Sequence, residues 1–150
     1  MADKQSPEKQ ALLRAYGAQV VLCPTNVEPE SPESYYSVAA RLARDIPGAF
    51  KPDQYWNQAN PIAHEATTGP EIWDQTEGHI THLVASVGTG GTVSGTAKFL
   101  RTKRPDIVVV GADPEGSVLS GDTARPYLTE GVGEDFFPGT YDPTVVDRWV

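Results

Sequence analysis

The sequence contains one cysteine, no long apolar run and few basic residues. Cys23 has no second cysteine to pair with, so the 150 residues form no internal disulfide and no cysteine-based zinc site. No stretch approaches the roughly 18 apolar residues of a membrane-spanning helix, and no signal-peptide pattern is present. These absences predict a protein of a reducing compartment, most simply the cytoplasm.

Positive charge is also scarce. Twelve Lys and Arg face 20 Asp and Glu, for a formal net charge of −8. Proteins that bind nucleic acid cluster their basic residues, and the nearest such stretch here, "KFLRTKRP" at 98–105, is interpreted as the solvated end of a helix. We therefore expect small-molecule partners, with no nucleic acid and no membrane. The three histidines lack a carboxylate cluster, so no metal site is predicted.

Helix and strand signals alternate along the chain. The apolar segment 18–23, "AQVVLC", is expected to be a short buried strand, and a capping box at Thr68 is expected to open a helix. Two further apolar runs, 81–87 and 107–111, flank a helix expected over about 92–102. This last group is typical of a βαβ unit with parallel strands. The fold class predicted is α/β with a parallel sheet.

A glycine-rich loop lies between the 81–87 run and the helix that follows it. Its residues are Gly88, Thr89, Gly90, Gly91 and Thr92. The first turn of a helix has free N–H groups and a partial positive charge, and glycines let an anion approach the backbone closely. The loop therefore predicts a phosphate site, with a tight packing turn as the simpler alternative.

The residues around the glycines indicate which kind of phosphate ligand the loop could bind. A Walker loop is excluded because no lysine follows at the required position. A dinucleotide fingerprint needs glycines at its first, third and sixth positions; Gly88 and Gly90 match, but the sixth is Val93. Asp113 lies about where a ribose-binding acid would be. A dinucleotide-binding Rossmann domain thus stays open as an alternative to a single-phosphate ligand.

Four strings in order carry a family resemblance: "NPIAHEATTGPEIW", "VGTGGTVSG", "GADPEGS" and "EGVGEDF". Together they resemble the pyridoxal-phosphate-dependent β-replacement enzymes of fold type II, the cystathionine β-synthase and cysteine synthase family, over essentially the whole chain. The last two strings and the closing "VVDRWV" are more similar to cystathionine β-synthase. The resemblance implies part of the three-layer, tryptophan-synthase-β-like fold, with pyridoxal 5′-phosphate as cofactor.

The implied reaction joins serine, or an activated serine, to a thiol. With homocysteine as acceptor the product is cystathionine, in the transsulfuration route to cysteine, and with sulfide it is cysteine. The cystathionine β-synthase reaction is the main hypothesis and cysteine synthase its alternative. A non-catalytic module that binds an anion or a protein is a third reading.

The resemblance also implies site residues. The loop from Gly88 to Thr92 would form the phosphate cup, Gly131 a turn beside cofactor and substrate, and Gln54 a contact near the substrate carboxylate. No catalytic residue is expected in the chain, because none of its lysines matches the family lysine that holds the cofactor as a Schiff base. The five lysines are Lys4, Lys9, Lys51, Lys98 and Lys103.

The same resemblance implies a division of the chain. Residues 1–56 would belong to the smaller N-terminal domain of the parent enzyme and residues 57–150 to its larger, cofactor-binding domain. The chain is expected to be an internal fragment, truncated at both ends and inactive alone. The intact parent is expected to be a homodimer or a higher homo-oligomer.

Overall fold

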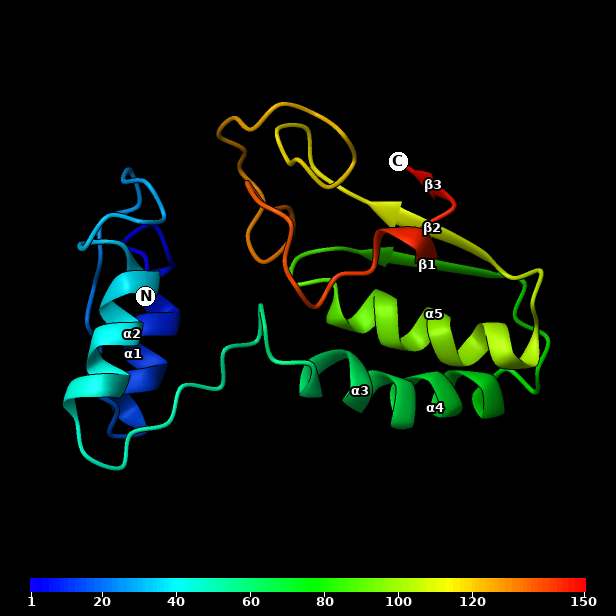
Figure 1. Cartoon of the computed structure of the whole chain (residues 1–150), viewed down its shortest axis with the longest axis horizontal. Coiled ribbons are helices and arrows are strands. Elements are labelled where there is room, and N and C mark those ends of the chain that lie inside the picture. Colours follow the sequence, from blue (N-terminus) through cyan, green and yellow to red (C-terminus); the bar gives the residue numbers. More distant parts are fainter. The chain divides into compact units, whose positions relative to one another are not determined.

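The computed structural model describes all 150 residues (Figure 1). The chain divides into two compact units, Met1–Pro52 and Asp53–Val150. The assignment of residues 1–56 and 57–150 to two domains of a larger enzyme stays a prediction.

The first unit contains helices α1 (Pro7–Ala15) and α2 (Tyr35–Asp45). The hydroxyl of Ser6 caps α1 and that of Ser34 caps α2, each accepting a hydrogen bond from the N–H three residues further on. Serine is favoured at this position because its oxygen satisfies an N–H group that has no partner inside the helix. Each of the two helices therefore begins directly after its capping serine.

The strand expected over residues 18–23 is wrong. The segment forms only an isolated parallel bridge, between Ala2 and Cys23. The N–H of Cys23 donates to the Met1 carbonyl at 2.9 Å, and the Met1 ammonium donates to the Val21 carbonyl at 2.7 Å. A strand needs a ladder of hydrogen bonds to a neighbouring segment. Residues 1–3 are too short to form such a ladder with residues 18–23. Cys23 is nevertheless buried, as expected of a small apolar side chain.

The second unit is built on a parallel sheet of β1 (His82–Ser86), β2 (Val108–Ala112) and β3 (Arg148–Trp149), in that order. Val84 pairs with Val110 in register, and Val110 pairs with Arg148. The connection from β1 to β2 passes through helix α5 (Gly91–Lys103), so the predicted βαβ unit and the α/β class are confirmed. The two-residue β3 was not predicted. A short 3₁₀ turn, Pro143–Val145, precedes it.

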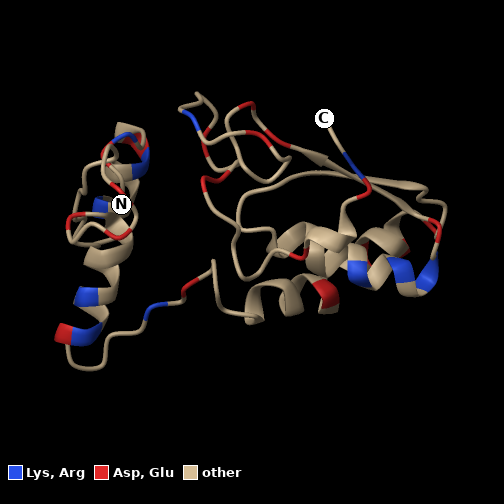
Figure 2. Cartoon of the chain, turned by 45° about the horizontal axis from the view of Figure 1, so that its top comes forward, with Lys and Arg blue, Asp and Glu red and all other residues tan.

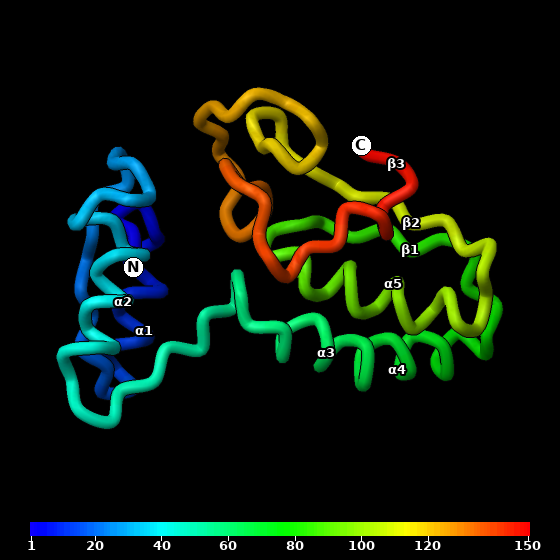
Figure 3. The backbone as a smooth tube through the Cα atoms, viewed as in Figure 1, coloured from blue at the N-terminus to red at the C-terminus, as the bar shows by residue number.

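Two more helices, α3 (Ala59–Ala66) and α4 (Thr68–Gln75), complete the unit. Figures 1 and 3 show α5 along one face of the sheet, with α3 and α4 packed on the side of α5 away from it. None of the chain's helices has the length and apolar character needed to cross a membrane.

The core of the unit lies between α5 and the sheet. Its buried members are Val87, Val93, Ala97, Val109, Leu119, Tyr141 and Val145. Leu83 and Ala85 of β1 pack against this cluster, whereas Val84 points the other way and is 64% exposed. Alternate residues of a strand face opposite sides of a sheet. This alternation determines which side chains of β1 face the core. The strand ends at Ser86, two residues before the glycine loop.

The region before β1 differs from the sequence prediction. The segment 49–61, "AFKPDQYWNQANP", is predicted from its two prolines to be extended or looped, yet its last three residues begin α3. Thr68 was expected to cap the next helix, but Thr68 is the first residue of α4 and Thr67 holds the N-cap position. The Thr67 hydroxyl does not cap α4; it donates instead to the Ala63 carbonyl at 2.8 Å. The Thr68 hydroxyl lies instead 2.9 Å from Nδ1 of His64.

The basic stretch 98–105 forms the last turns of α5 and the residues after it (Figure 2). Lys98 pairs with Glu65 at 2.7 Å, and Arg101 with Asp147 at 2.9 Å. Basic residues at this end of a helix are stabilised by the partial negative charge of its free carbonyls. The interpretation of this stretch as the solvated end of a helix is consistent with these contacts.

Candidate functional site

The glycine loop connects the carboxyl end of β1 to the first turn of α5. Gly90 holds the N-cap position with a left-handed φ of 77°, and no side chain caps the helix there. A Cβ on Gly90 would overlap Tyr141, and one on Gly91 would overlap the side-chain amide of Asn60. Both positions therefore require glycine because of close approach, and at Gly90 also because of its backbone conformation.

The backbone N–H groups of this loop are free of backbone acceptors. The first bond inside α5 runs from the Ser94 N–H to the Gly90 carbonyl at 2.9 Å, and no N–H from Gly88 to Val93 donates to a carbonyl. The Gly91 N–H makes one long contact, 3.5 Å, with the Thr89 hydroxyl. Unpaired N–H groups at a helix N-terminus form an anion site. The loop has the donor set that a phosphate ester needs.

Residues of α3 hold the two threonine hydroxyls of the loop. Asn60 donates its side-chain amide to Thr89 Oγ1 at 3.1 Å. His64 Nε2 lies 3.0 Å from Thr92 Oγ1. The unexpected helix α3 is thus the element that fixes the side chains of the glycine loop.

The second glycine turn packs against the start of this loop. The Gly131 carbonyl oxygen lies 3.0 Å from the position that a Cβ on Gly88 would occupy. The Gly133 N–H donates to the Val87 carbonyl at 2.7 Å, which fastens the turn to the end of the β1 segment. The structure thus brings Gly131 next to Gly88, although they are far apart in sequence. A role for Gly131 toward a ligand stays a prediction.

Gln54 is exposed and is joined to the loop through its backbone. Its carbonyl accepts from Asn60 Nδ2 at 2.8 Å and lies 3.2 Å from the Thr140 hydroxyl oxygen. Thr140 is only 2% exposed, and its hydroxyl donates to the Thr89 carbonyl at 2.7 Å. Asn60 and Thr140 are the residues that sequence reasoning missed. The role of the Gln54 side chain toward a substrate stays a prediction.

Asp113, the residue that would bind a ribose in the dinucleotide alternative, has a local structural role. Its Oδ2 accepts from the Ser120 N–H at 3.0 Å, and its own N–H donates to the Val150 carbonyl at 3.0 Å. The side chain therefore braces the loop that follows β2.

A tyrosine beside the second glycine turn has a perturbed acidity. Burial, and after it the carboxylate of Glu134, raises the pKa of Tyr127 to about 12. Its phenol oxygen lies 2.9 Å from the position of a Cβ on Gly133. The Tyr127 hydroxyl consequently stays protonated at neutral pH and can donate a hydrogen bond near the turn, but it cannot act there as a base.

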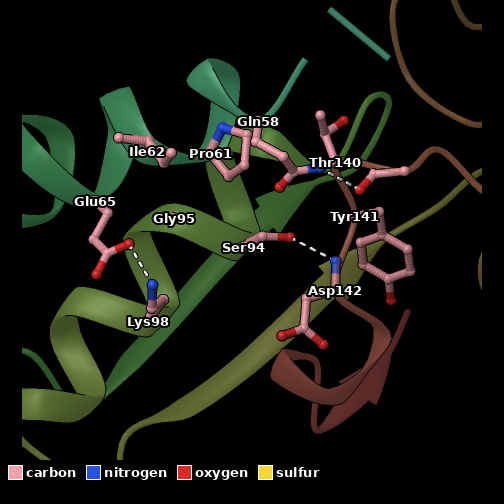
Figure 4. Close-up of a pocket in the computed structure, with 11 residues that line it drawn as sticks. Gln58, Pro61, Ile62, Glu65, Ser94, Gly95, Lys98, Thr140, Tyr141 and Asp142 are labelled. Atoms are coloured by element: carbon pink, nitrogen blue, oxygen red, sulfur yellow. Dashed lines mark hydrogen bonds and ion pairs between the residues drawn. The ribbon is translucent and has the colours of Figure 1, made fainter. Parts of the chain in front are cut away.

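An open cavity of about 260 Å³ lies elsewhere on this unit, between α3, α5 and residues 139–142 (Figure 4). Its floor includes Ser94, whose hydroxyl accepts from the Asp142 N–H at 2.9 Å. The ion pair of Lys98 with Glu65 stands at its edge and neutralises both charges. No residue of the glycine loop from Gly88 to Thr92 lines the cavity. The free amides, rather than this cavity, are the site with phosphate-binding chemistry.

Comparison of the chain with known proteins identifies its family. The model of a family described as "Pyridoxal-phosphate dependent enzyme" matches residues 1–150. The chain belongs to this family. The family resemblance read from the four sequence strings is thereby confirmed, and the pyridoxal-phosphate reading is favoured over the dinucleotide one.

Individual relatives in this pyridoxal-phosphate family agree. Cystathionine β-synthase of Oryctolagus cuniculus is 47% identical, over 99% of this chain and 28% of that protein. Cysteine synthase of Staphylococcus aureus is 42% identical, over 98% of this chain and 47% of that protein. The chain thus spans less than half the length of either relative.

The fold agrees as well. The crystal structure of the O-acetylserine-dependent cystathionine β-synthase from Helicobacter pylori superposes with a TM-score of 0.89 and 36% identity, over 99% of this chain and 48% of that one. The tryptophan-synthase-β-like fold predicted from the resemblance is confirmed by this match. The family and these relatives use pyridoxal phosphate, and the residues of the glycine loop fit its phosphate because their N–H groups are free and side chains are excluded by close packing.

Proposed function

We propose that this chain carries the phosphate-binding part of a pyridoxal-phosphate-dependent β-replacement enzyme. The observation that carries the proposal is the run of N–H groups from Gly88 to Val93 that donate to no backbone carbonyl at the start of α5. A phosphate ester is a dianion near neutral pH, so it is stabilised by several such donors and by the helix dipole.

The residues take distinct roles in this proposal. The amides of Gly88 to Thr92 bind the phosphate, Gly131 lines the space beside the cofactor, and the Gln54 side chain donates to a substrate carboxylate. When bound, pyridoxal phosphate supplies an electron sink for the substrate carbanion. None of the chain's lysines anchors the cofactor: in the second unit Lys98 is engaged with Glu65, seven residues along α5 from Gly91.

The reaction of the whole protein is proposed from its relatives. We infer a serine, or an activated serine, as the donor and a thiol as the acceptor. Homocysteine, giving cystathionine, is the favoured acceptor, since the cystathionine β-synthase of Oryctolagus cuniculus is 47% identical. Sulfide stays the alternative because the Staphylococcus aureus cysteine synthase is 42% identical.

The same proposal extends to the setting of the whole protein. We infer residues 1–56 and 57–150 to be parts of a smaller and a larger domain. A homodimer or higher homo-oligomer in the cytoplasm, with no nucleic-acid or membrane partner, completes the proposal. The single, buried Cys23 is consistent with a reducing compartment.

The phosphate site is tested by titrating the chain with 4′-deoxypyridoxine 5′-phosphate, a cofactor analogue without the reactive aldehyde. We expect amide NMR shifts concentrated at residues 88–93. Pyridoxine, which lacks the phosphate, is the control and should leave these amides unmoved. If both compounds shift the same amides equally, or neither shifts them, the proposal is wrong.

The acceptor is tested in a protein that contains the chain within a complete enzyme of this family. Cystathionine formation from serine or O-acetylserine with homocysteine is compared with cysteine formation from sulfide, as kcat/KM ratios. A higher ratio for homocysteine is expected. A higher ratio for sulfide would favour the cysteine synthase alternative.

A further inference from the structure

The hydrogen-bonding state of Thr89 in the phosphate loop is set by its neighbours. A threonine hydroxyl has one proton to donate and two lone pairs that accept. Thr89 Oγ1 accepts from Asn60 Nδ2 at 3.1 Å and, more weakly, from the Gly91 N–H at 3.5 Å. Its accepting capacity is therefore used, and its proton is left for a group outside these contacts.

Asn60 is held so that it can only donate to this hydroxyl. The same Nδ2 donates to the Gln54 carbonyl at 2.8 Å, while the amide packs against the Cα of Gly91, where a side chain would overlap it. A flipped amide would place its oxygen against the Gln54 carbonyl oxygen, where two acceptors repel. The orientation that donates to Thr89 is thus fixed from both sides.

Thr140, which is distant in sequence, reinforces this arrangement. Its hydroxyl lies 3.2 Å from the Gln54 carbonyl and 2.7 Å from the Thr89 carbonyl. The segment that contains Gln54 is consequently fastened to the phosphate loop through both the backbone and the side chain of Thr89. A change at Asn60 would alter the loop and this segment together.

We propose that Asn60 is a positioning residue: by donating to Thr89, it turns the Thr89 hydroxyl into a proton donor toward the bound phosphate. The inference rests on the proposed function, since it assumes the phosphate lies on the free amides of the loop. Asn60 itself touches no phosphate. Its effect is exerted through the Thr89 hydroxyl, and the Gln54 carbonyl, which accepts from the same amide, holds that amide in its donating orientation.

Two substitutions separate this role from simple packing. Asn60→Ala removes the donor and leaves the Thr89 hydroxyl free to rotate. Asn60→Asp keeps the shape but can only accept, so it draws the Thr89 proton away from the phosphate and adds a negative charge. A packing role predicts that the isosteric Asp is the milder change, whereas the positioning role predicts that Asp is the more harmful one. Because the Asp charge also repels a phosphate, the part of the loss that passes through the Thr89 hydroxyl is measured by the double-mutant cycle with Thr89→Val.

The test measures the dissociation constant of 4′-deoxypyridoxine 5′-phosphate by amide NMR on the full chain. We expect Asn60→Ala to weaken binding about threefold and Asn60→Asp about tenfold or more, as for lost hydrogen bonds to a charged acceptor. Gln58→Glu is the matched control: it makes the same amide-to-carboxylate change on a residue that donates to the Gly139 carbonyl. It should weaken binding less than about twofold, because exposed charges are screened.

A double-mutant cycle adds a second measurement. In the Thr89→Val background, which lacks the hydroxyl, Asn60→Ala should cause no further loss of affinity. If Asn60→Asp fails to fold, as judged by thermal unfolding, this cycle decides. Equal losses with and without the Thr89 hydroxyl would overturn the inference.

The outcomes distinguish the inference from the function on which it rests. A chain that binds no phosphate ester overturns the proposed function and the inference with it. A chain that binds the phosphate ester, but whose Asn60→Asp variant binds as well as Asn60→Ala or better, overturns the inference alone.

Discussion

The Cβ of Tyr141 occupies the space into which a side chain on Gly90 would project. Gly90 also has a φ of 77°, which L-residues with a Cβ adopt at a cost of roughly 1–2 kcal/mol. Overlap in a packed core adds about 1–3 kcal/mol. We therefore expect Gly90→Ala to lower the free energy of unfolding by about 2–5 kcal/mol, and to weaken phosphate binding because the loop must move.

Gly121→Ala is the matched control for Gly90→Ala. Gly121 has a similar φ of 91°, but no atom lies within 4 Å of the position of its Cβ. It should show only the backbone cost, about 1–2 kcal/mol in chemical denaturation. Equal losses for the two variants would show that the contact with Tyr141 contributes nothing.

The loop and its flanks could be predicted from the sequence because their signals are local. Two apolar runs with glycines and a helical pattern between them define β1, α5 and β2. Helix α3 lacked such a signal: its N-cap, Gln58, makes no side-chain cap bond, and Pro61 lies in its first turn, where proline is read as a loop residue as readily as a helix start.

The contacts that hold the site could not be predicted in the same way. Thr140 reaches the Gln54 carbonyl across 86 positions of sequence, and Asn60 reaches Thr89 across 29. Nothing in the composition of either segment specifies such a partner. Conversely, the apolar pattern of residues 18–23 suggested a strand because pattern alone does not show whether a neighbouring strand exists.

The buried side chains of α5 should contribute a large part of the stability of the second unit. Leu100, on α5, has no exposed surface, so Leu100→Ala leaves a cavity and should cost about 2–5 kcal/mol. Leu128→Ala is the control, since that side chain is fully exposed and should change the free energy of unfolding by less than about 0.5 kcal/mol. Urea denaturation of both variants measures the difference. Similar values for the two would contradict the described packing.

The loop after β2 should make stability depend on pH in the acid range. The Gly116 N–H bond, then the Arg125 guanidinium and the Thr123 N–H, lower the pKa of Asp122 from 3.8 to about 2. Because the folded-state pKa lies below the unfolded one, this carboxylate stabilises the fold fully above about pH 4, and the contribution disappears as the pH falls toward 2.

Asp122→Asn should therefore flatten the pH dependence of unfolding between about pH 4 and pH 2, and leave its shape above pH 5 unchanged. The measurement is the free energy of unfolding at a series of pH values for both proteins. Asp74→Asn, which alters an exposed carboxylate on α4, is the control and should leave the profile as it is. A steeper acid limb in Asp122→Asn would be the wrong sign for this mechanism.

The chain alone should not form a defined covalent complex with the cofactor. In the second unit the two lysines lie on the later turns of α5, with Lys98 paired to Glu65 and Lys103 positioned 5.7 Å from the Phe99 ring centre. Lys98 is seven residues beyond Gly91, or about 10 Å along the helix axis, and its amine is paired with Glu65 of α3. Treatment with pyridoxal phosphate and borohydride, followed by peptide mass spectrometry, should show scattered low-level modification of lysines. We also expect no turnover of serine with a thiol.

The Staphylococcus aureus cysteine synthase is the control for this labelling experiment: treated identically, it should give one dominant modified lysine. A single dominant lysine in this chain, accompanied by turnover, would contradict the assignment of all its lysines to non-catalytic positions.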